Sequence, residues 1–268
     1  MNSKIPKSSN QAAKPNRIMS KEKEHALEVP DLEADGINPQ LFKITFQKYG
    51  SILVRNLLDK NKLNDIRRIA EDAYNNADNM TKSGSDLGVS FRDHGHINAA
   101  SLGKEDGVPK ILKMFANSQI PYLYKDLLGE NIKVLTGNSL PRRQHPGKHN
   151  PPVPFHQDAS FMGNPGLIIN SWIPLNEAGL KAPGVQVVLR PESLVYNQSA
   201  FETRRPTTYN EIDISRNSAL SGITSEQLWA PVIAPGDVLF FSHLTIHRTY
   251  QTDTMSLPRI SLEIRCMG

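Results

Sequence analysis

The stretch PGDVLFFSHLTIHRT (residues 235–249) contains a turn, an apolar strand and a histidine in close succession. Proline and glycine at its start are typical of a turn, and the run Val238–Phe241 is rich in β-branched and aromatic side chains, which favours a strand. A short segment that ends in His247 follows. We therefore predict that a buried strand here leads directly to a candidate site histidine.

Further segments in the second half of the chain have the same strand-like character. They are short, and Pro-Gly pairs separate them, as at Pro165-Gly166 and Pro183-Gly184. Because strands follow helices instead of alternating with them, we predict an α+β protein, mainly β, whose second half is a sandwich or barrel. The predicted strands cover residues 132–136, 167–172, 185–189, 238–241 and 260–264.

The first half of the folded chain is predicted to be mainly helical. Asp59 is a good N-cap for a helix over residues 60–76, where apolar side chains recur at the helical period. A second helical pattern covers residues 108–128. Pro121 interrupts this pattern and Gly129 ends it, as a glycine just beyond a helix commonly does.

Two long polar segments separate these elements. Residues 80–107 follow the first helix, and residues 191–230 lie between predicted strands. Both are too long for ordinary connections, so we expect loops that could close over a binding site. Before the first helix, residues 51–55 are predicted to form a strand that follows a turn at Tyr49-Gly50.

Composition excludes several classes of protein. The chain has 268 residues, of which 38% are hydrophobic, and this is enough for a substantial core. Its one cysteine, Cys266, excludes an intramolecular disulfide framework and a zinc site built from cysteines. No apolar run approaches the roughly 18 residues of a membrane span, and the N-terminus lacks the apolar core of a signal peptide. We expect a soluble, cytoplasmic protein with no membrane partner.

The net charge of +4 lies in the first 24 residues, which carry six basic and two acidic side chains. The other 244 residues hold 25 of each sign, so the folded part lacks the basic stripe of a nucleic-acid-binding domain. Residues 1–36 are also poor in apolar side chains. We predict a disordered basic tail over residues 1–36 and a single domain over residues 37–268, with order beginning near Leu41.

The segment Phe155-His156-Gln157-Asp158 places an imidazole and a carboxylate two residues apart. On a strand, residues i and i+2 face the same side, so His156 and Asp158 would project together. Alone, such a pair is more often two surface residues than a metal site. A second histidine from a distant strand, His247, would complete a set of two histidines and one carboxylate, which is typical of non-haem Fe(II) oxygenases.

An arginine twelve residues after His247 adds a further element. The planar fork of Arg259 can bind a carboxylate bidentately, which suits a dicarboxylate ligand. Two alternatives are open: His243 shares strand parity with His247 and could replace it, and Arg265 could replace Arg259. The spacing favours His247 with Arg259, and His243 is then a hydrogen-bonded core residue or one that supports the metal ligands.

With these residues, the chain resembles the phytanoyl-CoA dioxygenase family of Fe(II)/2-oxoglutarate-dependent oxygenases. The resemblance rests on His156-x-Asp158, on His247 with Thr249 two residues later, and on Arg259. It spans about residues 40–266. The chain departs from the family pattern after a middle strand, where the usual Pro-Gly-Ser-His turn reads Arg-Pro-Glu-Ser-Leu at 190–194.

The resemblance implies a double-stranded β-helix core, a jelly roll of the cupin kind, flanked by N-terminal helices. It also implies bound Fe(II), 2-oxoglutarate as cosubstrate, and O2. The implied reaction is hydroxylation of a small molecule, with decarboxylation of 2-oxoglutarate to succinate and CO2. The implied metal ligands are His156, Asp158 and His247; Arg259 and Thr249 would bind 2-oxoglutarate, and Trp172, which is equally explained as a core aromatic, would line the pocket.

The carboxylate at position 158 bears on the reaction type. Related halogenases on this scaffold have a small residue there, which leaves room for chloride. The presence of Asp158 therefore favours hydroxylation, leaves desaturation as a minor alternative and argues against chlorination. The main rival is a jelly-roll protein that binds zinc or another metal without turnover. A structural zinc site would normally have a fourth protein ligand and would not explain Arg259.

Several basic clusters could contact an acidic small-molecule substrate, although such clusters are more often solvent-exposed than functional. They are Arg142, Arg143, Lys148 and His149 before the metal pair, Arg92, His94 and His96 with Asp93 in the first long loop, and Arg204 and Arg205 in the second.

Overall fold

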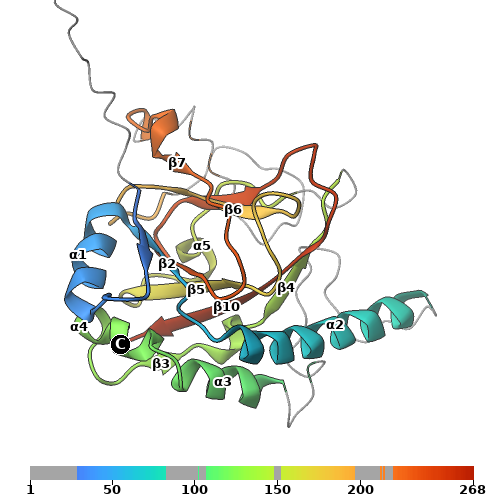
Figure 1. The fold of residues 1–268 in the computed structure, drawn as a ribbon. Helices are drawn as coiled ribbons and strands as arrows, with labels where there is room; N and C mark the ends of the chain where they lie inside the picture. Colours follow the sequence, from blue (N-terminus) through green and yellow to red (C-terminus); the bar gives the residue numbers. More distant parts are fainter. Residues whose placement is uncertain are drawn as a thin grey trace, which may run out of the picture.

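The computed structural model describes residues 29–82, 102, 107–147, 152–196, 212, 214 and 220–268. The larger sheet lies in the middle of the molecule, with helices on one side of it and the smaller sheet on the other (Figure 1). The helices come from the first half of the chain and most strands from the second, as predicted for an α+β protein.

The secondary structure elements follow the predicted order. The helices are α1 (Pro39–Tyr49), α2 (Lys60–Lys82), α3 (Val108–Ala116), α4 (Ile120–Leu128) and α5 (Ala159–Met162), with short 3-10 helices at Thr136–Asn138 and Ser225–Gln227. The strands are β1 (Asp31–Glu33), β2 (Ser51–Arg55), β3 (Lys133–Val134), β4 (Pro141–Gln144), β5 (Ile168–Pro174), β6 (Gly184–Val188), β7 (Leu228–Trp229), β8 (Val238–Ser242), β9 (His247–Tyr250) and β10 (Arg259–Met267).

Within the described ranges, these strands form two sheets. The larger has the order β1-β2-β8-β5-β10-β3, with β4 also paired to β10, and the smaller has the order β7-β6-β9. Apart from the parallel pair β1 and β2, the pairs are antiparallel. Two facing, mainly antiparallel sheets with many long-range pairings are typical of the double-stranded β-helix, so the predicted jelly-roll core with flanking helices is confirmed.

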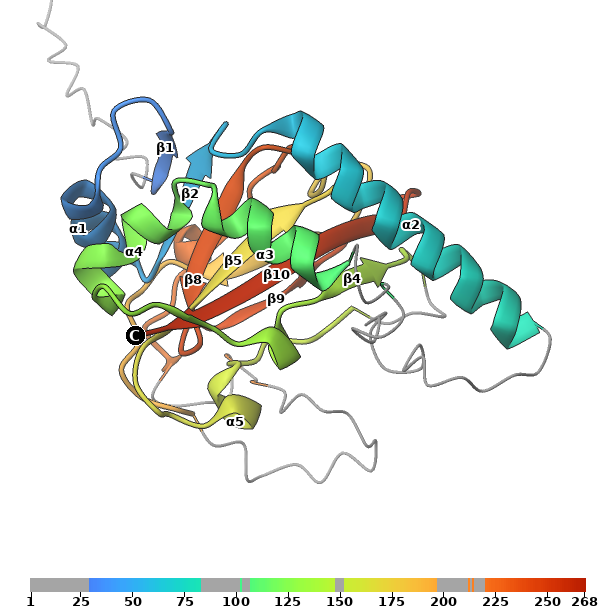
Figure 2. The same ribbon diagram turned by 90° about the horizontal axis from the view of Figure 1, so that it is seen from below.

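Side chains of the larger sheet point alternately to its two faces, so the sheet contributes to two hydrophobic cores. On β2, Ile52 and Val54 face the helices, whereas Leu53 faces the smaller sheet. Strand β8 repeats this pattern: Phe240 packs with the helices and Phe241 between the sheets. Both faces are buried, which is why these strands read as continuous apolar runs. Figure 2 shows α2, α3 and α4 lying across the outer face of this sheet.

Strand β10 is apolar on one face and polar on the other. Ile260, Leu262, Ile264 and Cys266 belong to the core beneath the helices. The alternate residues, Arg259, Ser261, Glu263 and Arg265, are also buried, but they lie on the opposite face. Charged side chains on a buried face need polar or charged partners. The partners of these β10 side chains belong to the site described below.

The helix boundaries follow local signals in the sequence. The Asp59 carboxylate accepts a hydrogen bond from the Asn61 amide at 2.8 Å, which caps α2, although that helix continues to Lys82 instead of ending near residue 76. Pro121 divides the second helical region as predicted, and it lies in the first turn of α4, where its missing N–H has no intrahelical partner to lose. Gly129 follows α4 with φ 81°.

The folded part begins earlier than the predicted boundary at residue 36. Strand β1 pairs with β2 in parallel, and the Asp31 carboxylate binds the Arg55 guanidinium through two hydrogen bonds of 2.6 and 2.7 Å. The charge pattern of the sequence did not indicate that Asp31 would contact Arg55. Residues 1–28 and most of the two long loops lie outside the described residues. Among the residues that the structure describes, the helices are too short or too polar to cross a bilayer.

Candidate metal centre and cosubstrate pocket

Two histidines from distant parts of the chain lie side by side between the sheets. His247 is the first residue of β9, and His156 lies in the segment that follows β4. Their backbones pair directly: the His156 amide donates to the His247 carbonyl at 2.9 Å, and the reverse bond measures 3.0 Å. The centroids of the two rings are 4.2 Å apart. Backbone pairing therefore fixes the spacing of the two imidazoles.

Each histidine is oriented by a backbone carbonyl. Nδ1 of His156 lies 2.8 Å from the Pro154 carbonyl oxygen, and Nδ1 of His247 lies 2.9 Å from that of Thr245. Since a carbonyl can only accept, each Nδ1 donates to it, and in the neutral imidazole the lone pair then lies on Nε2. This arrangement is typical of histidines that bind metals through Nε2.

Asp158 reaches the same point by a route different from the predicted one. The residue does not continue a strand; it precedes α5 with φ −60° and ψ −27°, and its carbonyl accepts from Met162 at 2.9 Å. The structure therefore brings Asp158 beside His156 as predicted, but strand alternation is not the reason. A tight helical turn, not strand pleating, directs the carboxylate towards the histidines.

The three side chains present one atom each to a common point. Oδ1 of Asp158 lies 3.7 Å from Nε2 of His156 and 3.7 Å from Nε2 of His247. Ligand bonds of about 2.0–2.3 Å allow atoms at this separation to share one ion. Oδ1 is buried and has no hydrogen-bond partner among the described residues, and coordination to a metal ion would satisfy it. The donor set of two imidazoles and one carboxylate fits Fe(II).

The charge states of these side chains favour the binding of a cation. Burial by itself would raise the pKa of Asp158, but the Arg265 guanidinium, whose Nε donates to Oδ2 at 2.8 Å, and the two histidines hold it well below its usual range. Burial, together with the neighbouring His156, lowers the pKa of His247 to about 4. At neutral pH the site therefore presents an ionised carboxylate and a neutral His247.

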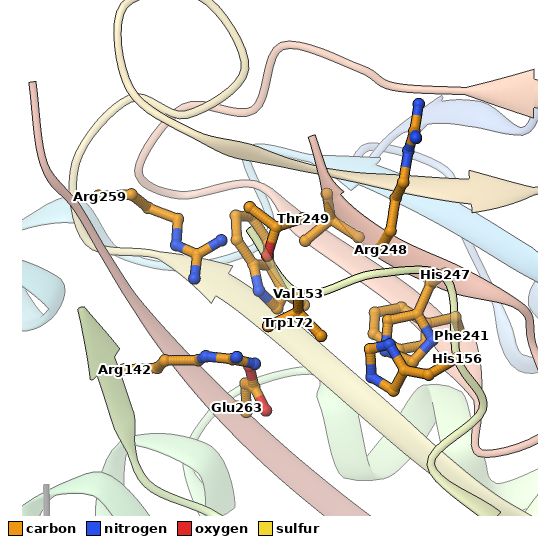
Figure 3. A pocket seen from close by; sticks show the side chains of 11 residues that line it. Arg142, Val153, His156, Trp172, Phe241, His247, Arg248, Thr249, Arg259 and Glu263 are labelled. Atoms are coloured by element: carbon orange, nitrogen blue, oxygen red, sulfur yellow. The ribbon is translucent and has the colours of Figure 1, made fainter. Parts of the chain in front are cut away.

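A cavity extends from the two histidines between the sheets. Figure 3 shows His156, His247 and Phe241 on one side, Arg259 and Arg142 on the other, and Thr249 and Trp172 between them. Arg259 is only 1% exposed, its Nη1 lies 3.4 Å from the Gly184 carbonyl oxygen, and its guanidinium carbon is 5.5 Å from the Trp172 ring centroid. The sequence-predicted residues thus gather around one cavity.

The alternatives raised from the sequence have different locations. The Ile168 amide donates to Nδ1 of His243 at 3.3 Å, and Nε2 of His243 lies 3.2 Å from Oδ1 of Asn164. These contacts explain His243 as a hydrogen-bonded core residue. Arg142 lines the cavity, whereas Arg143 forms an ion pair with Asp78 at 2.6 Å. The other basic candidates fall outside the described residues: Lys148, His149, Arg92, Asp93, His94, His96, Arg204 and Arg205.

Sequence reasoning missed the charged neighbours of the carboxylate. Arg265 contacts Asp158, and its Nη2 donates to Glu263 at 2.8 Å. The other Glu263 oxygen lies 3.5 Å from Nη1 of Arg142. The available signal was the alternation of charged and apolar residues along β10, which points the charged ones away from the apolar core.

Comparison with known proteins agrees with this geometry. The chain matches the model of the phytanoyl-CoA dioxygenase (PhyH) family over residues 46–261, a range that contains the two histidines, Asp158 and Arg259. The chain belongs to the phytanoyl-CoA dioxygenase family. Its class is therefore that of the iron- and 2-oxoglutarate-dependent oxygenases, and its cofactors are iron and 2-oxoglutarate. A search of curated protein sequences gives no match.

Solved structures resemble the fold of this member of the phytanoyl-CoA dioxygenase family. The non-heme α-ketoglutarate-dependent carbocyclase SnoK from nogalamycin biosynthesis is 16% identical, with a TM-score of 0.57, over 87% of this chain and 85% of its own. The epimerase SnoN, in complex with Fe3+, α-ketoglutarate and nogalamycin RO, is 14% identical, with a TM-score of 0.58, over 86% and 85%. AviO1 from Streptomyces viridochromogenes Tue57 is 14% identical, with a TM-score of 0.54, over 86% and 95%. At these identities the likeness shows the fold alone.

Proposed function

We propose that this protein hydroxylates a small molecule, with His156, Asp158 and His247 as the iron ligands. The observation that carries the proposal is the convergence of two Nε2 atoms on a buried carboxylate oxygen that has no hydrogen-bond partner among the described residues. Bound iron with 2-oxoglutarate and O2 supplies the oxidising chemistry, in which 2-oxoglutarate leaves as succinate and CO2.

The second part of the proposal assigns the cosubstrate to the cavity. The guanidinium of Arg259 binds the distal carboxylate of 2-oxoglutarate, and the Thr249 hydroxyl donates a hydrogen bond to the same group. Both residues are buried and line the cavity that His247 also lines. Trp172 forms the wall beside Arg259. Burial strengthens this ion pair because no water competes for the carboxylate.

The chain's own residues also bear on the outcome of the reaction. Asp158 occupies the position that a halide would need, which supports hydroxylation over chlorination. The named functions of SnoK and SnoN are carbocyclisation and epimerisation, so this fold accommodates more than one outcome. The complete set of two histidines and a carboxylate is the argument against chlorination, and the mass of the product tests hydroxylation against these other outcomes.

The cavity also suggests the charge of the substrate. Among the described residues that line it, Arg142 and Arg259 point into the cavity beside Glu263, whereas the guanidinium of Arg248 points away from them and its Nε donates to Gln186 at 2.7 Å (Figure 3). Arg259 is assigned to 2-oxoglutarate, so the support for a negatively charged substrate is Arg142, whose partner Glu263 is shared with Arg265. A panel of matched anionic and neutral small molecules tests this point.

The function is tested with Fe(II)-loaded wild-type protein. Under anaerobic conditions, 2-oxoglutarate should produce the charge-transfer absorption of an iron-bound 2-oxo acid. With O2 and a substrate from the panel, succinate should form and the product should gain one oxygen atom, as measured by mass spectrometry. Asp158→Ala should lose both the absorption and the product. Arg143→Met should retain both, because Arg143 forms its ion pair with Asp78 outside the cavity. A wild-type protein that binds no 2-oxoglutarate in the presence of Fe(II) would overturn the proposal in favour of a metal-binding protein without turnover.

A further inference from the structure

The Asp158 carboxylate has two oxygens in different surroundings. Oδ1 faces the two histidines, as described above. Oδ2 accepts a hydrogen bond of 2.8 Å from Nε of Arg265. The side chain of Asp158 is 1% exposed, so water cannot take the place of this arginine. One oxygen is thereby turned towards the metal position and the other is engaged by the protein.

Arg265 is itself held on several sides. Its Nη2 donates to Oε2 of Glu263 at 2.8 Å, and its Nη1 donates to the Asn138 carbonyl at 2.6 Å. Its backbone amide donates to Oγ of Ser139 at 3.0 Å, within strand β10. Guanidinium groups have a rigid planar fork, so three contacts in fixed directions determine where Nε points. A lysine ammonium could not meet all three at once.

We infer that Arg265 is a positioning residue that makes Asp158 a one-oxygen metal ligand. The inference rests on the proposed metal-binding role of Asp158. A carboxylate that binds an ion through one oxygen leaves one more coordination position open than a carboxylate that binds through both. Sites of this class need open positions for the cosubstrate and O2. Arg265 keeps a position open by occupying Oδ2.

This role differs from the one that the sequence left open for Arg265. The alternative was a clamp for the distal carboxylate of 2-oxoglutarate, which requires a guanidinium directed into the cavity. The described residues that line the cavity include Arg259 and Arg142 but not Arg265, whose fork is directed at Asp158, Glu263 and Asn138. Arg265 therefore acts through Asp158 and not on the cosubstrate.

The experiment measures Co(II) binding to the full-length protein, because the visible spectrum of Co(II) reports its ligands without turnover. The variants are Arg265→Met, which removes the charge, and Arg265→Lys, which keeps the charge but loses the fork. Removing a partner that orients a metal ligand typically weakens metal binding on the order of 10–100-fold. We expect a loss near the upper end of this range and a changed Co(II) spectrum for Arg265→Met, and a smaller loss of about 10-fold for Arg265→Lys. Arg143→Met, which removes an arginine from the ion pair with Asp78, should bind Co(II) as the wild type does.

The outcomes distinguish a failure of the positioning role of Arg265 from a failure of the proposed metal site. Wild-type Co(II) affinity and spectrum in both Arg265 variants, even with a lowered melting temperature, would show a merely structural role and overturn the inference. If Arg265→Met does not fold, Arg265→Lys decides alone, and wild-type binding in that variant overturns it. A wild-type protein that binds no Co(II) would instead refute the metal site on which the proposed function depends.

Discussion

Replacing Arg259 by methionine should weaken 2-oxoglutarate binding strongly while leaving the metal site in place. The guanidinium is 1% exposed, so its proposed partner, a carboxylate, would be left in a buried position without a counter-charge. Losing one member of a buried, hydrogen-bonded charge pair costs about 2–5 kcal/mol, which corresponds to roughly 30-fold to several thousand-fold in affinity. Arg142 lines the same cavity and partly compensates, so we expect a value near the lower end, on the order of 100-fold.

The assay is calorimetric titration of 2-oxoglutarate into protein saturated with Co(II), without O2. Arg259→Lys keeps the charge but loses the fork, and it should show an intermediate loss of about tenfold. Arg143→Met serves as the control, because its arginine forms an ion pair with Asp78 outside the cavity. Co(II) affinity should be equal in all four proteins. If Arg259→Met binds 2-oxoglutarate as tightly as the wild type, the assignment of the cavity is wrong.

Four further perturbations have expected outcomes. His156→Ala and Asp158→Ala should abolish turnover but keep the wild-type circular dichroism spectrum, because neither side chain is part of the apolar core and Arg265, the partner of Asp158, keeps its contacts with Glu263 and Asn138; loss of folding would contradict this. Product made in chloride buffer should gain oxygen, and a chlorine isotope pattern in its mass spectrum would contradict the role given to Asp158. Burial raises the pKa of Cys266 to about 12, so a thiol reagent at neutral pH should label it only after unfolding, and rapid labelling of native protein would refute its burial. Asp237→Ala removes a carboxylate that bonds the Arg55 guanidinium at 2.9 Å and two backbone amides, and denaturant titration should show a loss of about 3 kcal/mol.

The sequence was most informative where local chemistry sets the structure. Strands such as β8 consist of β-branched and aromatic runs between turn residues, and Pro121 and Gly129 mark the helix ends directly. The candidate metal ligands could also be predicted, because His-x-Asp and a distant histidine are rare in combination with a correctly spaced arginine. These features depend on residues close together in sequence or on a motif of fixed spacing.

Features that depend on strand register could not be predicted in the same way. Arg265 meets Asp158 across 107 positions of sequence, and only the pairing of β10 with its neighbours brings them together. The pairing of Asp31 with Arg55 likewise depends on the parallel contact of β1 with β2. Two arginines on the same face of β10 are chemically equivalent in the sequence, and their different roles arise from what each one meets in the folded chain.

The direct backbone pairing of His156 with His247 has a consequence for which ion the protein carries. Because backbone hydrogen bonds set the spacing of the two imidazoles, this spacing does little to discriminate between metal ions of similar size. Nickel, copper and zinc bind nitrogen and oxygen donors more tightly than Fe(II) does. We therefore expect the metal content of the protein to follow the ions available to it, and the share of active enzyme in a cell to follow the supply of ferrous iron.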